Sequence, residues 1–190
     1  MLEVAGGSAT AFEELVLRYQ ARLVRVLEHL VGGRHLAEDL AQEVFLRVFR
    51  ARKQYVVTAK FATWLFTIAS RVASNALRDR SRRREVAWGA GDNGPREAPP
   101  IERLVQASTG SMPARQLDKA EVRQVVRLAL ESLNERQRLA VLLNKFEGMS
   151  YADIAATLDL SPPAVKSLLS RARDNLREVL EPYLTHGTAP

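Results

Sequence analysis

Residues 150–173 read "SYADIAATLDLSPPAVKSLLSRAR" and place two adjacent prolines directly ahead of an amphipathic helical pattern. Proline inside a helix removes a backbone hydrogen bond and clashes with the preceding turn. In the first turn it is tolerated, because the amides there have no partner within the helix. Ser161 can cap the helix and Pro162 can occupy its first position. The prolines therefore predict where a helix begins, not where one breaks.

The segment before the prolines predicts two further helices. Asn134 with Gln137, and Ser150 with Asp153, have the spacing of capping boxes. The first box opens a helix that we expect to end near Gly148, and the second opens the short helix "YADIAATL". Only the turn "LDL" separates this short helix from the next one, which predicts a helix-turn-helix unit.

The last helix of this unit has two different faces. Its apolar face, predicted to pack in the core, carries Val165, Leu168, Leu169, Ala172 and Leu176. Its outer face carries Lys166, Ser167, Ser170, Arg171 and Asp174. Such a helix can enter the DNA major groove and read bases, while Arg173 and Arg177 would reach phosphates. The alternative is a solvated charged face, since helix-turn-helix units also occur in proteins that never bind DNA.

The bulk composition is compatible with a polyanionic partner. The 190 residues include 28 Lys and Arg against 22 Asp and Glu, a net charge of +6. Cysteine is absent and the three histidines are widely spaced, so no disulfide, metal site or other cofactor is expected. The sequence has no run of apolar residues long enough to span a membrane and no signal-peptide pattern at its start. We therefore expect a cytoplasmic protein without membrane insertion.

The amino-terminal half also has helical periodicity. Apolar residues recur every three or four positions from Ala11 to the glycine pair at 32–33, over 36–50 and over 61–78. Residues 1–10 are expected to be a frayed terminus, and residues 51–60 to be partly irregular. No segment shows the alternation typical of a strand, so the predicted fold class is all-α.

The chain is predicted to form two small helical domains, 11–80 and 114–184, joined by a flexible linker, 81–113, that is rich in Gly and Pro. The first domain has 12 basic and 7 acidic side chains, whereas the second has 11 and 10. At the start of the linker, "RDRSRRR" (78–84) holds five arginines. Such a run is usually only solvated; the alternative is that it helps to hold DNA or a protein partner.

Three stretches carry a resemblance to a known family. "AEDLAQEVFLRVFRARKQY" (37–55) and "FATWLFTIASRVASNALR" (61–78) resemble region 2 of bacterial extracytoplasmic-function (ECF) sigma factors, of the sigma-70 family. "LNERQRLAVLLNKFEGMSYADIAATLDLSPPAVKSLLSRARDNLRE" (133–178) is similar to region 4. The resemblance implies a three-helix-type region 2 and a helix-turn-helix region 4. It also implies a non-enzymatic subunit that binds core RNA polymerase and directs promoter-specific initiation.

The resemblance also implies roles for individual residues. The resemblance assigns docking on the clamp helices of the largest polymerase subunit to Asp39, Gln42, Glu43, Arg47 and Arg50. It implies that Leu40 and Phe45 support this helix from the core. Contact with the −10 promoter element is carried over to Lys53, Tyr55, Lys60, Phe61, Trp64 and Arg71. Contact with the −35 element is carried over to Lys166, Ser167, Ser170, Arg171 and Arg173.

The residues themselves agree with these roles. Residues 50–64 supply both aromatic and basic side chains in one short stretch, as trapping an unstacked base requires. Phe61 and Trp64 could instead be partly core, so Tyr55 is the favoured base contact. Asp39 and Glu43 could simply be a solvated pair, because no third metal ligand accompanies them.

The expected partners are core RNA polymerase (clamp helices and flap), promoter DNA and an anti-sigma factor, with no obligate homo-oligomer. Three departures from the family pattern leave the promoter sequence open: "YVVTAK" in the loop, Arg71 where asparagine is frequent, and "SPPA" before the recognition helix. Two other functions remain open as well. One is a free-standing helix-turn-helix repressor or activator, and the other is a helical interaction module or enzyme that does not bind DNA.

Overall fold

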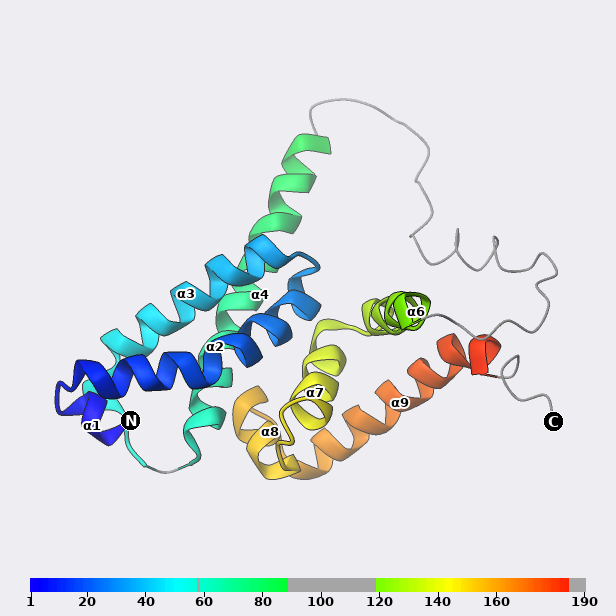
Figure 1. The fold of residues 1–190 in the computed structure, drawn as a ribbon. Helices are drawn as coiled ribbons and strands as arrows, with labels where there is room; N and C mark the ends of the chain where they lie inside the picture. Colours follow the sequence, from blue (N-terminus) through cyan, green and yellow to red (C-terminus); the bar gives the residue numbers. More distant parts are fainter. Residues whose placement is uncertain (58, 89–118, 185–190) are drawn as a thin grey trace.

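The computed structural model describes residues 1–57, 59–88 and 119–184, and this part of the chain is entirely helical apart from its turns and loops (Figure 1). The helices are α1 (Leu2–Ala5), α2 (Ala9–Val31), α3 (Arg34–Arg50), the 3-10 turn η1 (Arg52–Gln54), α4 (Phe61–Trp88), α6 (Lys119–Glu131), α7 (Glu135–Lys145), α8 (Tyr151–Leu158) and α9 (Pro162–Leu184). The prediction of an all-α fold is confirmed.

We call residues 1–57 and 59–88 the first lobe. Its core is a bundle of α2, α3 and α4, whose apolar stripes face one another. The largest side chains fully buried there include Leu23, Leu27, Val44, Leu65 and Phe66. Removing each such side chain from water stabilises the bundle by about 1.5–3 kcal/mol.

The amino terminus differs from the expectation. Residues 1–10 were expected to fray, but Leu2–Ala5 form α1 and the Val4 side chain is only 1% exposed. Ser8 then caps α2, because its hydroxyl accepts a hydrogen bond from the Ala11 amide at 3.2 Å. At the other end Gly32 adopts φ 75°, a left-handed conformation that glycine accommodates without strain and that ends α2.

We call residues 119–184 the second lobe, and its helix starts follow the sequence signals. Both predicted capping boxes are present, Asn134 with Gln137 at α7 and Ser150 with Asp153 at α8. Pro162 is the first residue of α9, and the Ala164 amide donates to the Ser161 hydroxyl at 3.4 Å. The predicted role of the prolines is therefore confirmed.

The helix-turn-helix unit is closed by apolar packing. Val165, Leu169 and Ala172 on α9 are buried in the same core cluster as Ile154 and Ala155 on α8. Asp159 makes the turn between the two helices at φ 55°, in the left-handed region that Asp and Asn tolerate better than most residues. The tight turn thus fixes how α9 leaves the core.

Helix α4 is longer than predicted. It was expected to end near residue 78, with a linker from residue 81, but it continues to Trp88. Arginine is a good helix former, so the arginine-rich run can extend a helix without apolar periodicity. Arg80, near the start of this extension, donates to the Val31 carbonyl at 3.2 Å. The rest of the predicted linker, 89–113, lies outside the described residues.

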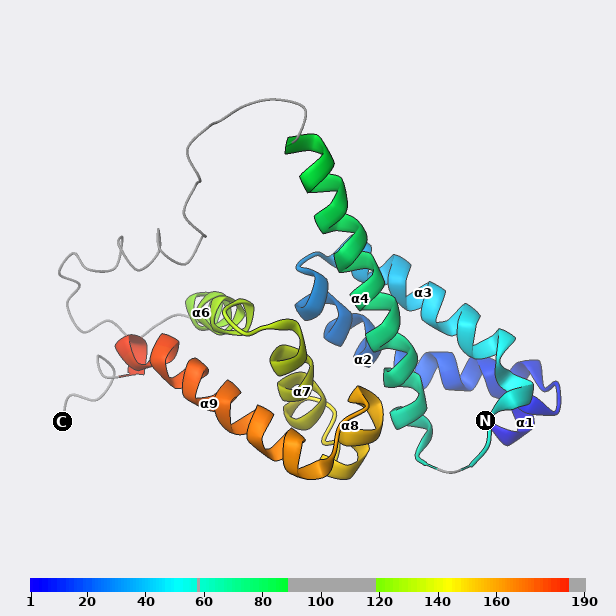
Figure 2. The ribbon, with the colours of Figure 1, turned by 180° about the vertical axis from the view of Figure 1, so that it is seen from behind.

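The two lobes pack directly against each other. Helix α8 lies against α4, and α7 and α6 contact α2 (Figure 2). A cluster of arginines from three helices surrounds the carboxyl end of α2. They donate hydrogen bonds to its last carbonyls: Arg80 to Val31 at 3.2 Å, Arg127 to Gly32 at 3.1 Å and Arg138 to Leu30 at 3.3 Å.

Arg138 donates hydrogen bonds to carbonyls of both lobes. Besides the Leu30 carbonyl, its guanidinium donates to the carbonyls of Leu130 and Glu131 at 2.8 Å each and of Leu133 at 3.0 Å. These hydrogen bonds cap the end of α6. Burial lowers the pKa of its guanidinium, ahead of the opposing effects of Glu131 and Glu135. One side chain therefore ties the α6–α7 turn of the second lobe to α2 of the first.

We predict that Arg138→Ala lowers the free energy of unfolding by about 2–3 kcal/mol, because part-buried carbonyls lose a charged donor. Urea unfolding followed by circular dichroism measures the change. Arg136→Ala, an exposed arginine two residues away on α7, is the matched control and should change stability far less. Equal losses for the two variants would contradict the assignment.

His29 predicts a pH dependence of the packing between lobes. Its ring lies 5.7 Å from that of Phe146 in the second lobe. Burial lowers the pKa of His29 below 6.5; Glu28 opposes the shift, whereas Arg127, Arg25 and Arg138 reinforce it. Because the unfolded chain binds this proton more tightly, stability falls as pH drops through 6.5 toward the folded-state pKa.

His29→Gln should remove this contribution, and the difference in unfolding free energy between wild type and variant should change with pH around 6.5. Asp153 does not interfere, since its pKa, lowered chiefly by the Ser150 hydroxyl, lies below 3.8. A pH-independent difference between the two proteins would show that His29 is not linked to folding.

Candidate nucleic-acid and protein interfaces

The outer face of α9 is open to solvent. All five residues predicted to contact the −35 element are exposed: Lys166, Ser167, Ser170, Arg171 and Arg173. Helices α7 and α8 lie between most of α9 and the first lobe (Figure 1). The Arg173 guanidinium donates to the Leu169 carbonyl of its own helix at 3.2 Å, so it lies along the helix. None of the described residues covers the face beside it.

The residues predicted to contact the −10 element fall into two groups. Tyr55, Phe61 and Trp64 form an aromatic cluster, with ring centroids 5.0 Å apart for Tyr55–Trp64 and 6.0 Å for Phe61–Trp64. Phe61 also packs on Tyr19 at 5.1 Å. Phe61 and Trp64 are partly buried against the core, as the alternative interpretation expected.

The basic members of that set lie on both sides of this cluster. Lys53 is exposed on η1, and Lys60, just before α4, is 75% exposed. Arg71 lies about 15 Å further along α4, at 1.5 Å per residue, and lines a cavity between α4 and the second lobe. The structure therefore brings together the loop residues and separates Arg71 from them.

The predicted polymerase-docking face lies on α3. Asp39, Gln42, Arg47 and Arg50 are exposed and Glu43 is half-buried. Glu43 accepts a hydrogen bond from the Arg47 guanidinium at 2.7 Å, the geometry of an i,i+4 pair on one helix face.

Phe45 and Leu40 pack α3 against the core of the first lobe. Phe45 is buried and Leu40 packs against the core cluster, so the core role predicted for both is confirmed. They hold the backbone of α3 against the bundle while its charged face stays outside.

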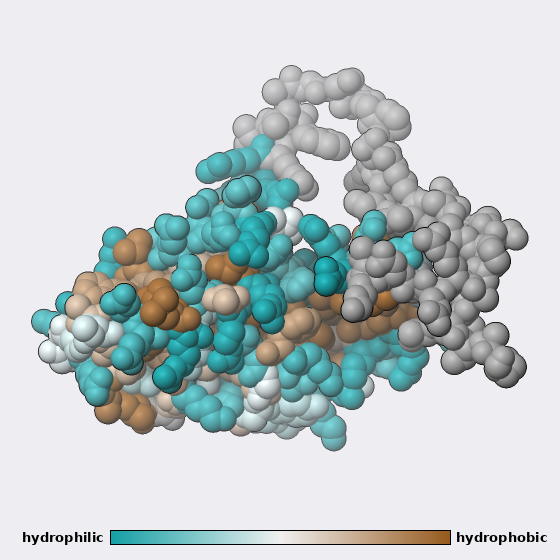
Figure 3. Space-filling model, in the orientation of Figure 1, coloured by the Kyte–Doolittle hydropathy of each residue, from teal (hydrophilic) through white to brown (hydrophobic). Residues whose placement is uncertain are grey.

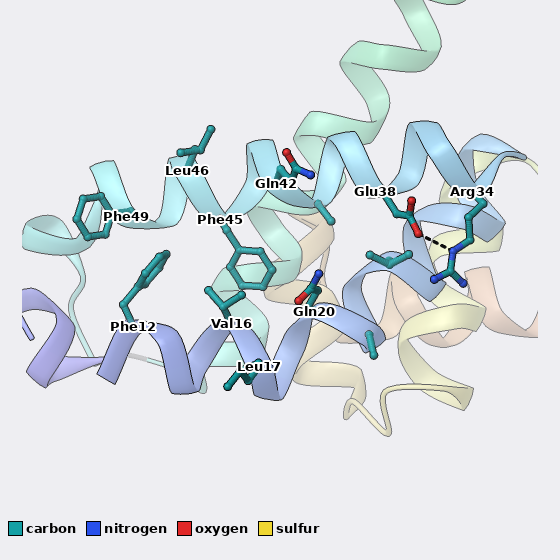
Figure 4. Close-up of a pocket in the computed structure, with 13 residues that line it drawn as sticks. Phe12, Val16, Leu17, Gln20, Arg34, Glu38, Gln42, Phe45, Leu46 and Phe49 are labelled. Carbon is teal, nitrogen blue, oxygen red and sulfur yellow. Dashed lines mark hydrogen bonds and ion pairs between the residues drawn. The ribbon is translucent and has the colours of Figure 1, made fainter. Parts of the chain in front are cut away.

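An apolar groove beside α3 was missed by sequence reasoning. It lies between α2 and α3, has a volume of about 910 Å³ and is lined by residues of both helices, among them Phe12, Val16, Phe45 and Gln42 (Figure 4). Leu17 and Leu46 are 71% and 51% exposed along it. Figure 3 shows the corresponding apolar surface over this end of the first lobe.

A signal for this groove exists in the sequence. Leu46 and Leu17 lie off the apolar stripes of their helices, where a solvated helix would carry polar residues. Phe49 is also exposed, and its ring lies 5.0 Å from that of Phe12 and 3.9 Å from the Arg52 guanidinium. Exposed large apolar residues that gather in one groove are typical of surfaces that bind another molecule.

Asp153 of α8 reaches across to the first lobe. One of its oxygens accepts from the Thr63 hydroxyl at 3.2 Å, and the other from Lys60 at 3.2 Å and from the Ser150 hydroxyl at 2.7 Å. The Ser150 hydroxyl foremost, then Lys60 and the Ser150 amide, lower the pKa of Asp153 against the opposing effect of burial. The sequence predicted its capping role but not its contact with α4.

Among the described residues, no cluster of three or more His, Asp or Glu side chains could hold a metal ion. In the same residues, no helix combines the length and the apolar character that crossing a bilayer requires.

The fold and these surfaces define a two-lobed helical protein with a helix-turn-helix and, on the other lobe, an exposed apolar groove beside α3. Residues 15–83 match the family model for sigma-70 region 2, and residues 123–176 match the model for sigma-70, region 4. The chain belongs to the sigma-70 family and is an alternative sigma factor for transcription initiation.

Individual relatives resemble the chain over nearly all of its length. It is 32% identical to the RNA polymerase sigma-H factor of Pseudomonas aeruginosa, over 95% of this chain and 92% of that protein. It is also 32% identical to the ECF RNA polymerase sigma-E factor of Escherichia coli strain K12, over the same shares of the two chains.

Two solved structures have a similar fold. The sigma factor RpoE, solved with the anti-sigma factor NepR from Bartonella quintana, has 27% identity and a TM-score of 0.62, over 91% of this chain and 98% of that one. CnrH, solved in complex with the cytosolic domain of CnrY, has 23% identity and a TM-score of 0.66, over 94% and 93%. The second likeness concerns the fold alone.

Proposed function

We propose that this ECF-type sigma factor docks on core RNA polymerase through α3 and reads promoter DNA with α9 and with the η1–α4 segment. The proposal depends mainly on one observation, the exposed Lys, Ser and Arg residues of α9. Helix α9 is the second helix of the helix-turn-helix, and it lies within the residues that match sigma-70 region 4. We also propose that the chain itself catalyses no reaction and acts in the cytoplasm beside the polymerase.

The recognition helix has the chemistry that duplex DNA requires. Arg and Lys can donate to guanine O6 and N7 in the major groove, and Ser can donate or accept at any base. Lys166 and Ser167 stand in the amino-terminal turns of α9, which enter the groove in this motif, and Arg171 follows one turn later. Arg173 is placed to contact phosphates rather than bases.

The η1–α4 segment supplies basic and aromatic groups for an opened strand. Lys53 and Lys60 are exposed on either side of Tyr55. Tyr55 remains the favoured stacking partner for an unstacked base, because Phe61 and Trp64 already pack against the core. Arg71 would contact the strand further along α4.

Docking on the polymerase is assigned to the α3 face and extends to the neighbouring apolar groove. Gln42 offers an exposed polar contact in the groove and Leu46 offers apolar area, while Asp39 is exposed on α3 one turn before Gln42. A polar rim around an apolar strip is the usual anatomy of a protein interface.

We further propose an anti-sigma factor as a regulatory partner. RpoE of Bartonella quintana, which is 27% identical over 91% of this chain, was solved in complex with the anti-sigma factor NepR. A protein that binds the α2–α3 groove would compete with the polymerase for the first lobe.

Run-off transcription with core polymerase and a promoter library tests the function as a whole. Addition of the full-length chain should confer initiation at a subset of promoters. A free-standing repressor or activator would leave core polymerase unable to initiate specifically, and that result would refute the proposal.

Arg171→Ala should weaken use of the −35 element by about 1–3 kcal/mol, because a bidentate contact to a guanine is lost. The measurement compares transcription from promoters with intact and scrambled upstream elements. Asn175→Ala, an exposed polar residue further along α9, is the matched control and should leave the ratio unchanged. An unaltered −35 preference in Arg171→Ala would exclude a reading role for Arg171.

Asp39→Arg should weaken binding to core polymerase about tenfold, or about 1.4 kcal/mol, because it reverses an exposed charge at the amino-terminal end of the docking face. Fluorescence anisotropy of the labelled full-length chain titrated with core polymerase measures the affinity. Glu13→Arg makes the same charge change at an exposed site of α2. If both variants bind alike, the α3 face is not the docking site.

A further inference from the structure

The 3-10 turn η1 connects α3 to the loop before α4 and ends at Tyr55, the favoured base contact. In its backbone, the Gln54 amide donates to the Ala51 carbonyl at 2.9 Å, and the Tyr55 amide donates to the Arg52 carbonyl at 3.4 Å. A 3-10 turn has poorer hydrogen-bond geometry than an α-helix. The position of Tyr55 therefore depends on side chains that hold η1 against the bundle.

Arg52 of η1 folds back onto the end of α3. Its guanidinium donates to the Phe49 carbonyl at 2.7 Å, and its Cζ atom lies 3.9 Å from the centroid of the Phe49 ring. The Phe49 carbonyl belongs to the last turn of α3, where carbonyls lack helical partners and carry the negative end of the helix dipole. The hydrogen bond and the cation–π contact together fix the position of the guanidinium.

Phe49 supports Arg52 from the side of the bundle. Its ring is 40% exposed, so it is not part of the buried core. It packs against Phe12 of α2, with ring centroids 5.0 Å apart (Figure 4). Phe12 packs in turn against the core cluster. A chain of contacts thus runs from the core through Phe12 and Phe49 to Arg52.

The other two residues of η1 point away from the bundle. Lys53 and Gln54 are exposed, whereas Arg52 is half-buried. Helix α1 also contacts η1. Beyond η1, the Tyr55 ring packs edge-on against Trp64 of α4, with centroids 5.0 Å apart. Arg52 is therefore the η1 side chain that ties the turn to α3, and Tyr55 ties its other end to α4.

A basic side chain in this part of the molecule has a simpler alternative role. Arg52 lies between Arg50 and Lys53 in the chain, and it could contact a DNA phosphate directly as a further positive charge. A phosphate contact, however, requires neither an aromatic ring beside the guanidinium nor a hydrogen bond to α3. The two roles differ in whether Arg52 acts through Tyr55 or independently of it.

We propose that Arg52 is a positioning residue for promoter opening. Bound to Phe49, it fixes the direction in which η1 leaves α3 and so holds Tyr55 against Trp64, where an unstacked base can reach it. Arg52 itself touches no base. The proposal rests on the proposed role of Tyr55 at the −10 element, but its geometric part is measurable in the free chain.

The position of Tyr55 is measured in the free, full-length chain by the fluorescence of Trp64. The chain has two tryptophans, so Trp88→Phe leaves Trp64 as the single emitter. Arg52→Met should raise the acrylamide quenching constant of Trp64 about twofold, because Tyr55 no longer covers its ring. Tyr55→Ala sets the scale of the full effect, and Arg18→Met, which changes an exposed arginine of α2, is the matched control. Unchanged quenching in Arg52→Met, or an equal rise in the control, overturns the proposal.

The functional test uses holoenzyme assembled from the full-length chain and saturating core polymerase, on a promoter selected from the library. Arg52→Met should slow open-complex formation about fivefold or more, the scale of one lost base-stacking contact. Phe49→Leu removes the ring beside the guanidinium and should have a similar effect, and the two changes combined should not add. The time course of abortive product synthesis measures the rate. An unchanged rate in Arg52→Met, or additive losses in the double variant, overturns the proposal.

A second combination separates positioning from direct phosphate contact. In a chain that already carries Tyr55→Ala, Arg52→Met should slow opening no further, because Arg52 acts through Tyr55. Multiplied losses would show that Arg52 contacts DNA on its own and would overturn the proposal. The salt dependence of promoter binding gives the same distinction. A lost phosphate contact lowers its slope by about one, whereas a lost positioning contact leaves the slope unchanged.

These outcomes separate the inference from the proposed function. If the unaltered chain supports no promoter-specific transcription, the proposed function fails, while Trp64 quenching still decides whether Arg52 holds Tyr55 in place. If transcription succeeds and Tyr55→Ala slows opening but Arg52→Met does not, the positioning role fails alone.

Discussion

The placement of the two lobes depends on which groups donate hydrogen bonds to the last backbone carbonyls of α2. The last carbonyls of any helix lack partners within it and carry the negative end of the helix dipole. Here Arg80 of α4, Arg127 of α6 and Arg138 of α7 donate to the carbonyls of residues 30–32. Arg138 adds the carbonyls that end α6. Because the three arginines come from both lobes, the helix end determines how the second lobe lies beside α2, and hence how α8 lies beside α4.

This placement divides the functional surfaces into an outer and an inner set. The α3 face and the outer face of α9 remain exposed, so a protein and a DNA duplex can reach them while the lobes stay packed. Thr63 and Ser74 of α4 face inward, toward Asp153 and Glu135 of the second lobe. The outer set can therefore be reached without any rearrangement of the lobes, whereas these two hydroxyl groups serve the contact between the lobes.

Much of the local structure could be predicted from the sequence, because it depends on near neighbours. The capping boxes at Asn134 and Ser150 and the role of Pro162 follow from spacing over a few residues. The burial of Val4 could not be predicted, since a four-residue helix shows no periodicity. The extension of α4 was missed because charged residues extend a helix without an apolar stripe. The pair Lys60–Asp153 spans 93 residues, and such long-range polar contacts leave no pattern in a single sequence.

The chemistry of the contact between lobes also determines how readily it can open. Within each lobe the helices are held by fully buried apolar side chains such as Phe66 and Ile154, which water cannot replace. Between the lobes the named contacts are hydrogen bonds, ion pairs and one ring contact, His29 with Phe146. An exposed ion pair such as Lys60–Asp153 contributes only about 0–1 kcal/mol, because water compensates most of its loss. The exception is Glu147, only 3% exposed beside Arg22, whose carboxylate regains full hydration when the lobes part. Buried residues of the two lobes also belong to one apolar cluster, so separating the lobes would expose apolar area as well as break these polar contacts.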